Sequence, residues 1–147
     1  MSTGVSADRR TLAVRLLTPV GTAFSGDVLM VIAPSVGGEV GILPRHAPLI
    51  AQLRVGEIRL KIDDETTEVF ATTEGYLSVE SDSVLIMVAQ AERLADIDRA
   101  RAEAGVAKAE EVLAAAGDDA TARTNAENRI RRNRNRLRVI EKHGDKL

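Results

Sequence analysis

The segment Glu57-Ile58-Arg59-Leu60-Lys61-Ile62 alternates strictly between charged and apolar side chains. A period of two residues is typical of a β-strand that buries one face and exposes the other. Asp63-Asp64-Glu65 follows as a turn signal and leads into a second strand-like run, residues 66–72. This stretch therefore predicts two neighbouring antiparallel strands joined by a tight turn.

The rest of the first 90 residues has the same character. Short apolar or alternating runs are separated by turn signals rich in Gly, Pro, Asp and Ser, at residues 10–17, 27–33, 76–80 and 84–89. No segment between them is long enough to form the helix of a parallel crossover. The residues therefore predict an all-β N-terminal domain, an antiparallel sandwich or barrel, over residues 1–90.

The composition changes after Gln90. Residues 91–116 contain ten Ala and no Pro, which favours a helix, and Gly117 supplies a stop signal. Asp118 or Asp119 would cap a second helix that runs to about Lys142. Two helices with so short a connection must fold back on each other. Residues 91–147 are thus predicted to form a C-terminal αα-hairpin.

Composition excludes several classes of function. The chain has no Cys, two His and three aromatic residues, so cysteine chemistry, a His-based metal site and aromatic stacking of bases are not expected. Its longest apolar runs have six residues, far below the roughly 20 that span a bilayer. Residues 1–10 lack the apolar segment of a signal peptide, which favours the cytoplasm.

Charge is distributed unequally. Residues 1–90 hold 7 Lys and Arg against 11 Asp and Glu, whereas residues 91–147 hold 13 against 11. Six arginines lie between Arg129 and Arg138, beside a narrow apolar stripe formed by Ala126, Ile130, Leu137 and Ile140. Such a cluster is either a solvated basic face or a surface for polyanions. Residues 91–147 also hold eleven carboxylates, and aromatic residues are scarce. Both observations favour a nucleotide or an acidic protein surface over nucleic acid as the polyanion.

Two charges fall on the predicted seam of the first helix. At 100° per residue, Asp98 and Arg101 share an arc with a set of apolar and small residues, Leu94, Gly105, Ala109, Val112, Leu113 and Ala116. One interpretation is an ion pair at a partly wet seam; the other is that both charges face a polar ligand held between the helices. The chain carries no P-loop, HExxH or GxSxG motif, so no catalytic site is predicted.

The loop Gly38-Glu39-Val40-Gly41-Ile42-Leu43-Pro44-Arg45-His46-Ala47-Pro48-Leu49 resembles the signature of the epsilon subunit of bacterial F-type ATP synthases. Its glycines and prolines predict a rigid protruding corner. The likeness extends over most of the chain and implies a β-sandwich followed by a helical hairpin. It also implies that the corner, with Glu39, Arg45 and His46, contacts other subunits.

The resemblance implies a non-catalytic subunit of the rotary, proton-translocating ATP synthase. Its expected partners are the gamma subunit and the c-ring, and the catalytic hexamer when the hairpin extends. The expected location is the cytoplasmic face of the cell membrane, as a peripheral protein without membrane insertion. The sandwich would couple the rotor parts, and the mobile hairpin would regulate ATP hydrolysis.

The hairpin also resembles the ATP-binding form of that family. Ile97-Asp98-x-x-Arg101-Ala102 matches its motif, and Glu92, Arg132 and Arg136 match further residues of the nucleotide site. Lys108 stands where the family has an arginine, so one forked contact to phosphate would become a point-charge contact. No cofactor is required under this interpretation, and ATP would act as a regulatory ligand. The alternative function is a free-standing nucleotide-sensing adaptor module, which would not co-purify with a gamma-type coiled coil.

Overall fold

The computed structural model describes residues 10–144. The predictions made for residues 1–9 and 145–147 lie outside this range. The chain divides into two compact units, Met1–Arg93 and Leu94–Leu147. This division lies three residues beyond the predicted boundary, because residues 91–93 form a strand of the first unit.

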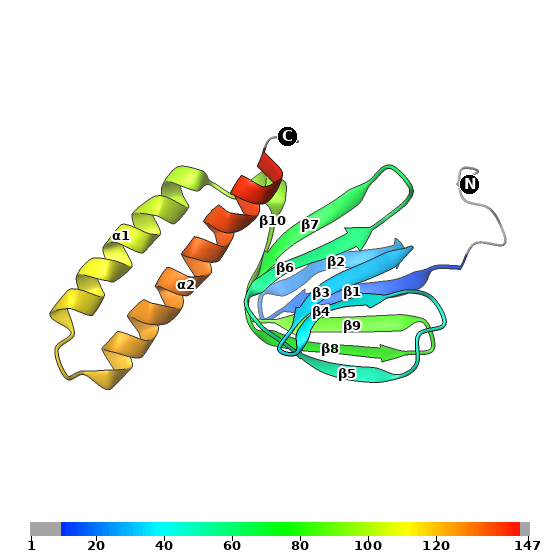
Figure 1. Cartoon of the computed structure of the whole chain (residues 1–147), viewed down its shortest axis with the longest axis horizontal. Helices are drawn as coiled ribbons and strands as arrows, with labels where there is room; N and C mark the ends of the chain where they lie inside the picture. Colours follow the sequence, from blue (N-terminus) through cyan, green and yellow to red (C-terminus); the bar gives the residue numbers. More distant parts are fainter. Residues whose placement is uncertain (1–9, 145–147) are drawn as a thin grey trace. The chain divides into compact units, whose positions relative to one another are not determined.

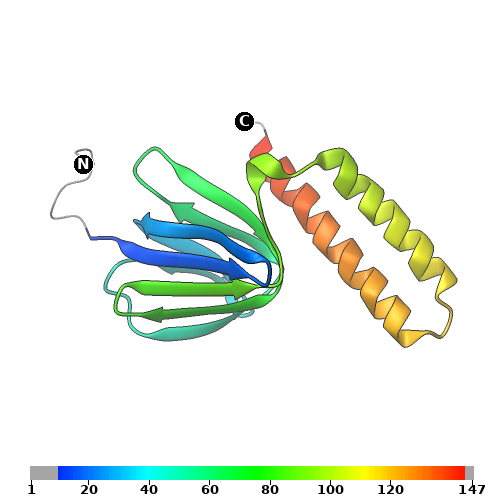
Figure 2. The same ribbon diagram turned by 180° about the vertical axis from the view of Figure 1, so that it is seen from behind.

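Within residues 10–93, the first unit is a β-sandwich of ten strands (Figures 1 and 2). The strands are β1 (Leu12–Thr18), β2 (Gly21–Val28), β3 (Met30–Ser35), β4 (Gly38–Ile42), β5 (Leu49–Leu53), β6 (Gly56–Lys61), β7 (Thr67–Thr72), β8 (Gly75–Glu80), β9 (Ser83–Val88) and β10 (Ala91–Arg93). One layer has the order β10-β7-β6-β3-β4 and the other β5-β8-β9-β1-β2, with a single residue pair joining β3 to β5. The predicted sandwich is therefore confirmed.

The alternation that predicts β6 also describes its burial. Ile58 and Leu60 are fully buried, while Arg59 and Lys61 are directed outward and only partly covered. Inward-facing positions on the other strands complete the core. Its buried side chains are aliphatic apart from the ring of Phe70, and they include Leu12, Leu16, Leu77 and Ile86. Burying such side chains stabilises the fold by roughly 1.5–3 kcal/mol each before entropy is counted.

The run at residues 27–33 is not one strand, and that prediction was wrong. It contains the end of β2 and the start of β3, with Leu29 between them. β2 lies in one layer and β3 in the other, so the chain changes sheets at Leu29, whose N–H donates to the carbonyl of Lys61 at 2.7 Å. Both layers share the core, so the apolar run continues through the bend.

The sandwich is also not wholly antiparallel. β1 pairs with β9 in parallel, with Val14 opposite Val84 and Leu16 opposite Ile86. Tight turns force antiparallel pairing only between strands adjacent in sequence. Seven strands, β2 to β8, lie between β1 and β9 in the sequence. The relative direction of β1 and β9 is therefore set by how the whole layer assembles, and not by a turn.

The second unit contains a short 3₁₀ helix, η1 (Leu94–Asp96), and two helices, α1 (Arg99–Ala115) and α2 (Ala120–His143). The predicted hairpin is present, but the first helix begins eight residues later than predicted. Ala91–Arg93 pairs with β7 instead, and the side chain of Asp98 caps α1 by accepting from the N–H of Arg101 at 3.1 Å. Gly117, at φ 56°, ends the first helix, and Asp119 caps the second, as predicted.

The first helix presents small residues to the contact between the two helices, and the second helix presents both small and branched ones. Ala102 and Ala109 of α1 and Ala126 and Ile130 of α2 are buried. Val112 is 38% exposed, so its assignment to the seam was wrong. No helix within residues 10–144 is long and apolar enough to cross a membrane.

Candidate functional site

The predicted corner, residues 38–49, combines a strand and a loop. Its first five residues form β4, which pairs with β3, so only the residues after β4 are free to form the predicted corner. Residues 43–48 then connect β4 to β5, with a turn closed by the bond from His46 N–H to the Leu43 carbonyl at 3.1 Å. Leu43 is 55% exposed, so the loop presents an apolar side chain to solvent.

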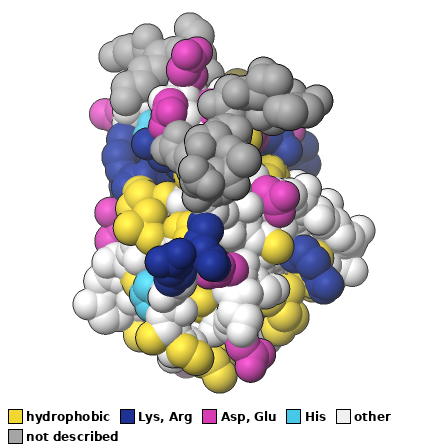
Figure 3. All heavy atoms as spheres, turned by 90° about the vertical axis from the view of Figure 1, so that its right-hand side faces the viewer, with side chains coloured by type: hydrophobic (Ala, Val, Ile, Leu, Met, Phe, Trp, Pro, Cys, Tyr) yellow, Lys and Arg dark blue, Asp and Glu magenta, His cyan; other side chains and the backbone are white. Residues whose placement is uncertain are grey.

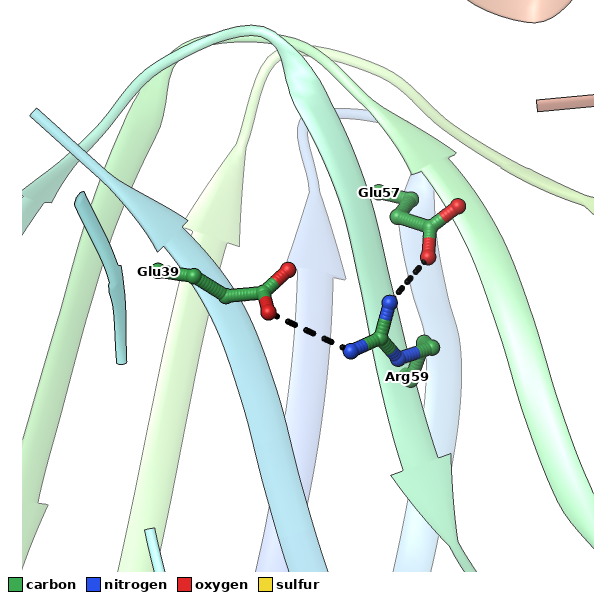
Figure 4. Close-up of polar contacts among 3 residues, drawn as sticks. All are labelled: Glu39, Glu57 and Arg59. Carbon is green, nitrogen blue, oxygen red and sulfur yellow. Dashed lines mark hydrogen bonds and ion pairs between the residues drawn. The ribbon is translucent and has the colours of Figure 1, made fainter. Parts of the chain in front are cut away.

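Glu39 takes part in an ion-pair network (Figure 4). One Arg59 nitrogen lies 3.3 Å from the Glu39 carboxylate, and another lies 2.6 Å from that of Glu57. The Glu57 side chain is nearly covered, whereas that of Glu39 is 52% exposed. An exposed pair of this kind contributes at most about 1 kcal/mol. The Glu39 carboxylate therefore keeps one side open to an external partner.

Arg45 and His46 occupy the middle of the loop. Arg45 is in the left-handed region at φ 70°, and its N–H donates to the Asp82 carboxylate at 2.6 Å. The Arg45 side chain is exposed. His46 Nδ1 lies 2.7 Å from the Ala47 carbonyl oxygen, which can only accept, so Nδ1 is the donor of this hydrogen bond. The backbone of this loop is thus fixed while its basic side chain remains accessible.

Figure 3 shows the end of the molecule that is on the right in Figure 1. Hydrophobic side chains lie beside a group of Lys and Arg side chains on this end, with Asp and Glu close by.

Sequence reasoning missed an apolar surface on the outer side of the layer that contains β1, β5, β8 and β9. Ile50 is 79% exposed, Tyr76 56% and Met87 50%. Met87 lies directly between Tyr76 of β8 and Leu17 of β1, and Leu17 and Met87 also line a shallow groove with Pro19. We call Ile50, Tyr76 and Met87 the outer apolar face.

The sequence did contain a signal for this surface. The run at residues 84–89 is apolar without alternation, although strands with one solvated face normally alternate. Val84, Ile86 and Val88 face the core, so Leu85 and Met87 are left on the outside. An unbroken apolar run in a sandwich strand indicates that both faces of the strand are suited to apolar contacts, one with the core and one on the outer side.

The residues of the predicted nucleotide site fall in both units. Glu92 lies in β10, opposite Ala71 of β7, and the other residues belong to the helical unit. Asp98 and Arg101 are both exposed at the start of α1, where Asp98 has the capping role described above. Neither charge lies on the buried seam, so that part of the sequence interpretation was wrong. Ile97 is half-buried just before the cap, and Ala102 is buried within the first turn.

Arg132 and Arg136 lie one turn apart on α2, and both are partly buried. The Arg136 guanidinium donates to the Asn133 side chain at 3.1 Å. Two guanidiniums four residues apart on one helix edge are suited to phosphate oxygens. Within residues 10–144, no group of three or more His, Asp or Glu side chains is arranged to hold a metal ion.

A family model described as the ATP synthase, Delta/Epsilon chain, beta-sandwich domain matches residues 11–94. This range coincides with the ten-stranded unit, including β10. The chain belongs to the ATP synthase epsilon chain family. The resemblance carried by residues 38–49 is therefore confirmed, and the chain is one subunit of an ATP synthase.

Relatives cover the helical unit as well. The ATP synthase epsilon chain of Halalkalibacterium halodurans is 43% identical over 129 residues, which is 88% of this chain and 96% of the relative. That of Bacillus velezensis is 39% identical over 130 residues, 88% of this chain and 97% of the relative. The similarity thus extends through both units.

Solved structures share the fold at lower identity. A chain in the cryo-EM structure of the Euglena gracilis mitochondrial ATP synthase, OSCP/F1/c-ring in rotational state 1, matches with a TM-score of 0.75 and 17% identity. The match covers 88% of this chain and 81% of that one. A chain of the Tetrahymena thermophila mitochondrial ATP synthase, central stalk/c-ring, matches with a TM-score of 0.51 and 18% identity, over 65% of this chain and 72% of that one.

Proposed function

We propose that this chain is a non-catalytic subunit of the central stalk of a rotary ATP synthase. Its sandwich unit joins the gamma subunit to the c-ring, at the cytoplasmic face of the cell membrane, without entering the bilayer. Membership of the epsilon chain family supports this role, as do solved chains of the same fold in assemblies described as OSCP/F1/c-ring and central stalk/c-ring.

The observation that carries the proposal is the outer apolar face. Three large side chains, each at least half exposed, lie on neighbouring strands of one layer. Exposure of apolar surface to water is unfavourable, and contiguous patches mark contact sites. We assign the gamma subunit to this face and the c-ring to the loop at residues 43–48 together with Glu39.

Co-purification with the gamma subunit tests this assignment. Replacing Met87→Glu places a charge at the centre of the outer apolar face and is expected to weaken gamma binding at least about tenfold, as loss of a central contact does. Thr67→Glu is the matched control, since Thr67 is an exposed strand position in the opposite layer. Equal binding by wild type and Met87→Glu would remove gamma from this face. No binding by wild type would favour the free-standing nucleotide-sensing adaptor.

The helical unit is proposed to regulate ATP hydrolysis. The buried residues of its first helix are two alanines, Ala102 and Ala109, which bury little apolar area per residue. Elements with little buried area open at low free-energy cost. In the extended state, the arginines of α2 would face acidic surfaces of the catalytic hexamer.

ATP is proposed to stabilise the closed hairpin at a site within the helical unit, formed by Ile97, Asp98, Arg101, Ala102, Arg132 and Arg136. Arg132 and Arg136 would bind phosphate oxygens, while the Asp98 carboxylate would accept from the ribose hydroxyls or the adenine amino group. A ligand that binds only the closed form stabilises it by about 2.7 kcal/mol at a hundred times its Kd.

Calorimetry with millimolar ATP tests the nucleotide site. Arg136→Ala should weaken binding at least about tenfold, since a charged contact to phosphate is lost. Arg131→Ala serves as the control, because Arg131 lies on the other edge of the helix and its guanidinium contacts Asn128. If wild type releases no heat, or if both variants bind ATP equally well, the site does not exist.

A further inference from the structure

The turn between β8 and β9 has an unusual backbone for its residues. Ser81 and Asp82 lie in the left-handed region, at φ 50° and 62°. Two-residue hairpin turns with this geometry favour Asn and Gly, because a Cβ is strained there. A Gly at position 82 would make the turn easier to form, so Asp82 has a local cost that its side chain must offset.

The Asp82 side chain joins segments that are far apart in the sequence. Its Oδ1 accepts from the backbone N–H of Arg45 at 2.6 Å, and its Oδ2 accepts from the Arg10 guanidinium at 3.3 Å. The Asp82 carbonyl accepts from the N–H of Ala13 at 2.8 Å. One turn residue is therefore bonded both to the start of β1 and to the loop at residues 43–48.

The bond to Arg45 is the one that acts on the loop. A carboxylate that accepts from a backbone N–H makes a charge-assisted hydrogen bond, which is shorter and stronger than a neutral one. The bond holds a residue that is itself at positive φ, inside the turn that is closed by the bond from His46 N–H to the Leu43 carbonyl. The other bonds described within the loop connect near neighbours, whereas Asp82 is 37 residues away from Arg45.

The position of Asp82 explains how it reaches the loop. Leu49 at the start of β5 pairs with Val79 of β8, so residues 43–48 extend beyond the end of β8 toward its turn. A side chain at residue 82 can meet the loop backbone there without any rearrangement of the strands.

We propose that Asp82 is a positioning residue, which holds residues 43–48 in the conformation that docks onto the c-ring. This inference rests on the proposed function, because it takes the loop as a docking element. Asp82 itself need not touch the partner. It fixes the backbone from which the Arg45 and Leu43 side chains project.

Three variants separate this role from a merely structural one. Asp82→Gly removes the carboxylate and relieves the left-handed strain, whereas Asp82→Asn keeps an oxygen acceptor for the Arg45 N–H. Asp63→Ala is the control, since the Asp63 carboxylate accepts from Glu65 and Thr66 within its own turn and makes no described bond to residues 43–48. Each full-length variant is examined by its melting temperature, by NMR hydrogen exchange of the Arg45 amide, and by affinity for a purified complex of gamma and c-ring.

The melting temperature of Asp82→Gly is expected to be no lower than that of wild type. Its Arg45 amide hydrogen is expected to exchange about tenfold faster, and the variant should dissociate from the gamma–c-ring complex about tenfold faster. Both changes follow from the loss of one charged hydrogen bond. For Asp82→Asn, the exchange rate of the Arg45 amide and the rate of dissociation from the complex should stay within about threefold of wild type, because the oxygen acceptor remains. Asp63→Ala should lose stability and keep its affinity.

Unchanged exchange of the Arg45 amide in Asp82→Gly would overturn the inference, whatever the affinity. Faster exchange with unchanged affinity would also overturn it, by showing that Asp82 orders a loop whose order does not matter for docking. Failure of the wild-type chain to bind the gamma–c-ring complex would reject the proposed function, and the exchange measurement would still decide whether Asp82 orders the loop.

Discussion

Gly75 is constrained by backbone that approaches it closely. Gly75 is the first residue of β8 and pairs with Val88 of β9 and Leu53 of β5. A Cβ at this position would overlap the carbonyl oxygen of Met87, and backbone cannot move aside as a flexible side chain can. The glycine is thus required by packing, with no positive φ involved.

Gly75→Ala should therefore lower the free energy of unfolding by about 1–3 kcal/mol, the usual cost of overpacking, or more. Urea unfolding of the full chain measures this. Gly37→Ala is the control, because the nearest atom to its added Cβ is the Ser35 hydroxyl at 3.9 Å, and a change within about 0.5 kcal/mol is expected. Similar stability of both variants would show that β8 and β9 separate easily at this point.

Asp63 supplies a pH-dependent contribution at the residue scale. The backbone N–H groups of Glu65 and Thr66 hold the pKa of the Asp63 carboxyl below its usual value of 3.8. A lowered pKa means that the ionised form stabilises the folded state. This stability is fully present above pH 3.8 and is lost as the pH falls through the lower pKa of the folded chain.

We therefore expect Asp63→Ala to melt below wild type at neutral pH, with the difference narrowing below pH 3.8. Melting curves between neutral pH and the acid limit of folding measure it. A difference that stays constant down to the lowest pH would mean that the carboxylate charge contributes nothing and that the turn needs Asp63 for another reason.

At the scale of elements, several arginines of α2 are ordered by asparagines three residues before them. Arg131 donates to Asn128 at 2.7 Å, Arg136 to Asn133 at 3.1 Å and Arg138 to Asn135 at 3.3 Å. Residues three apart are neighbours on a helix surface, so each pair forms within the helix itself. These contacts fix guanidiniums that would otherwise repel one another.

Asn133 also connects the two helices, and this yields a prediction for Gly105 of α1. A Cβ on Gly105 would lie 2.6 Å from the Asn133 amide nitrogen, which donates to the Arg129 carbonyl. Gly105→Ala should gain up to about 1 kcal/mol of helix propensity but lose the Asn133 contacts, so no net gain is expected.

Adding Asn133→Ala to Gly105→Ala should recover the gain, because the amide no longer occupies the space. Thermal unfolding followed by helical circular dichroism measures both variants and the double variant. If Gly105→Ala alone were stabilising by about 1 kcal/mol, as in an unpacked helix, the contact between Gly105 and Asn133 would not be close.

At the scale of the whole molecule, β10 decides where the chain divides. The strand pairs with β7, and the Arg93 guanidinium lies 4.9 Å from the centre of the Phe70 ring and forms an ion pair with Glu68. The ring of Phe70 also meets that of Phe24 edge-on, which links Arg93 to the core. The described residues from Leu12 to Arg93 are therefore part of the sandwich unit.

A chain that ends after Arg93 should fold as a β-sandwich, whereas one that ends after Gln90 should be less stable by about 1–3 kcal/mol through loss of β10 and its Arg93 contacts. Urea unfolding of the two shortened chains measures the difference. Equal stability would show that β10 adds nothing to the sandwich, and failure of both to fold would make the helical unit part of its core.

Local patterns in the sequence determined much of this fold. The alternation in residues 57–62 predicted β6, and the Ala content, Gly117 and Asp119 predicted two helices and the link between them. These signals are readable because pleat period, helix propensity and capping depend on residues within a few positions of one another. The motif in residues 38–49 likewise indicated the family.

Only the tertiary structure decided the features that join distant residues. The parallel pairing of β1 with β9, the strand β10, and the bonds of Glu39 to Arg59 and of Asp82 to Arg45 connect segments separated by 20 to about 70 residues. Such contacts depend on which strands become neighbours when both layers close around one core, and no local pattern specifies the partner. For this reason the sequence predicted a corner at residues 38–49, but the carboxylate that accepts from the Arg45 backbone became apparent only in the folded chain.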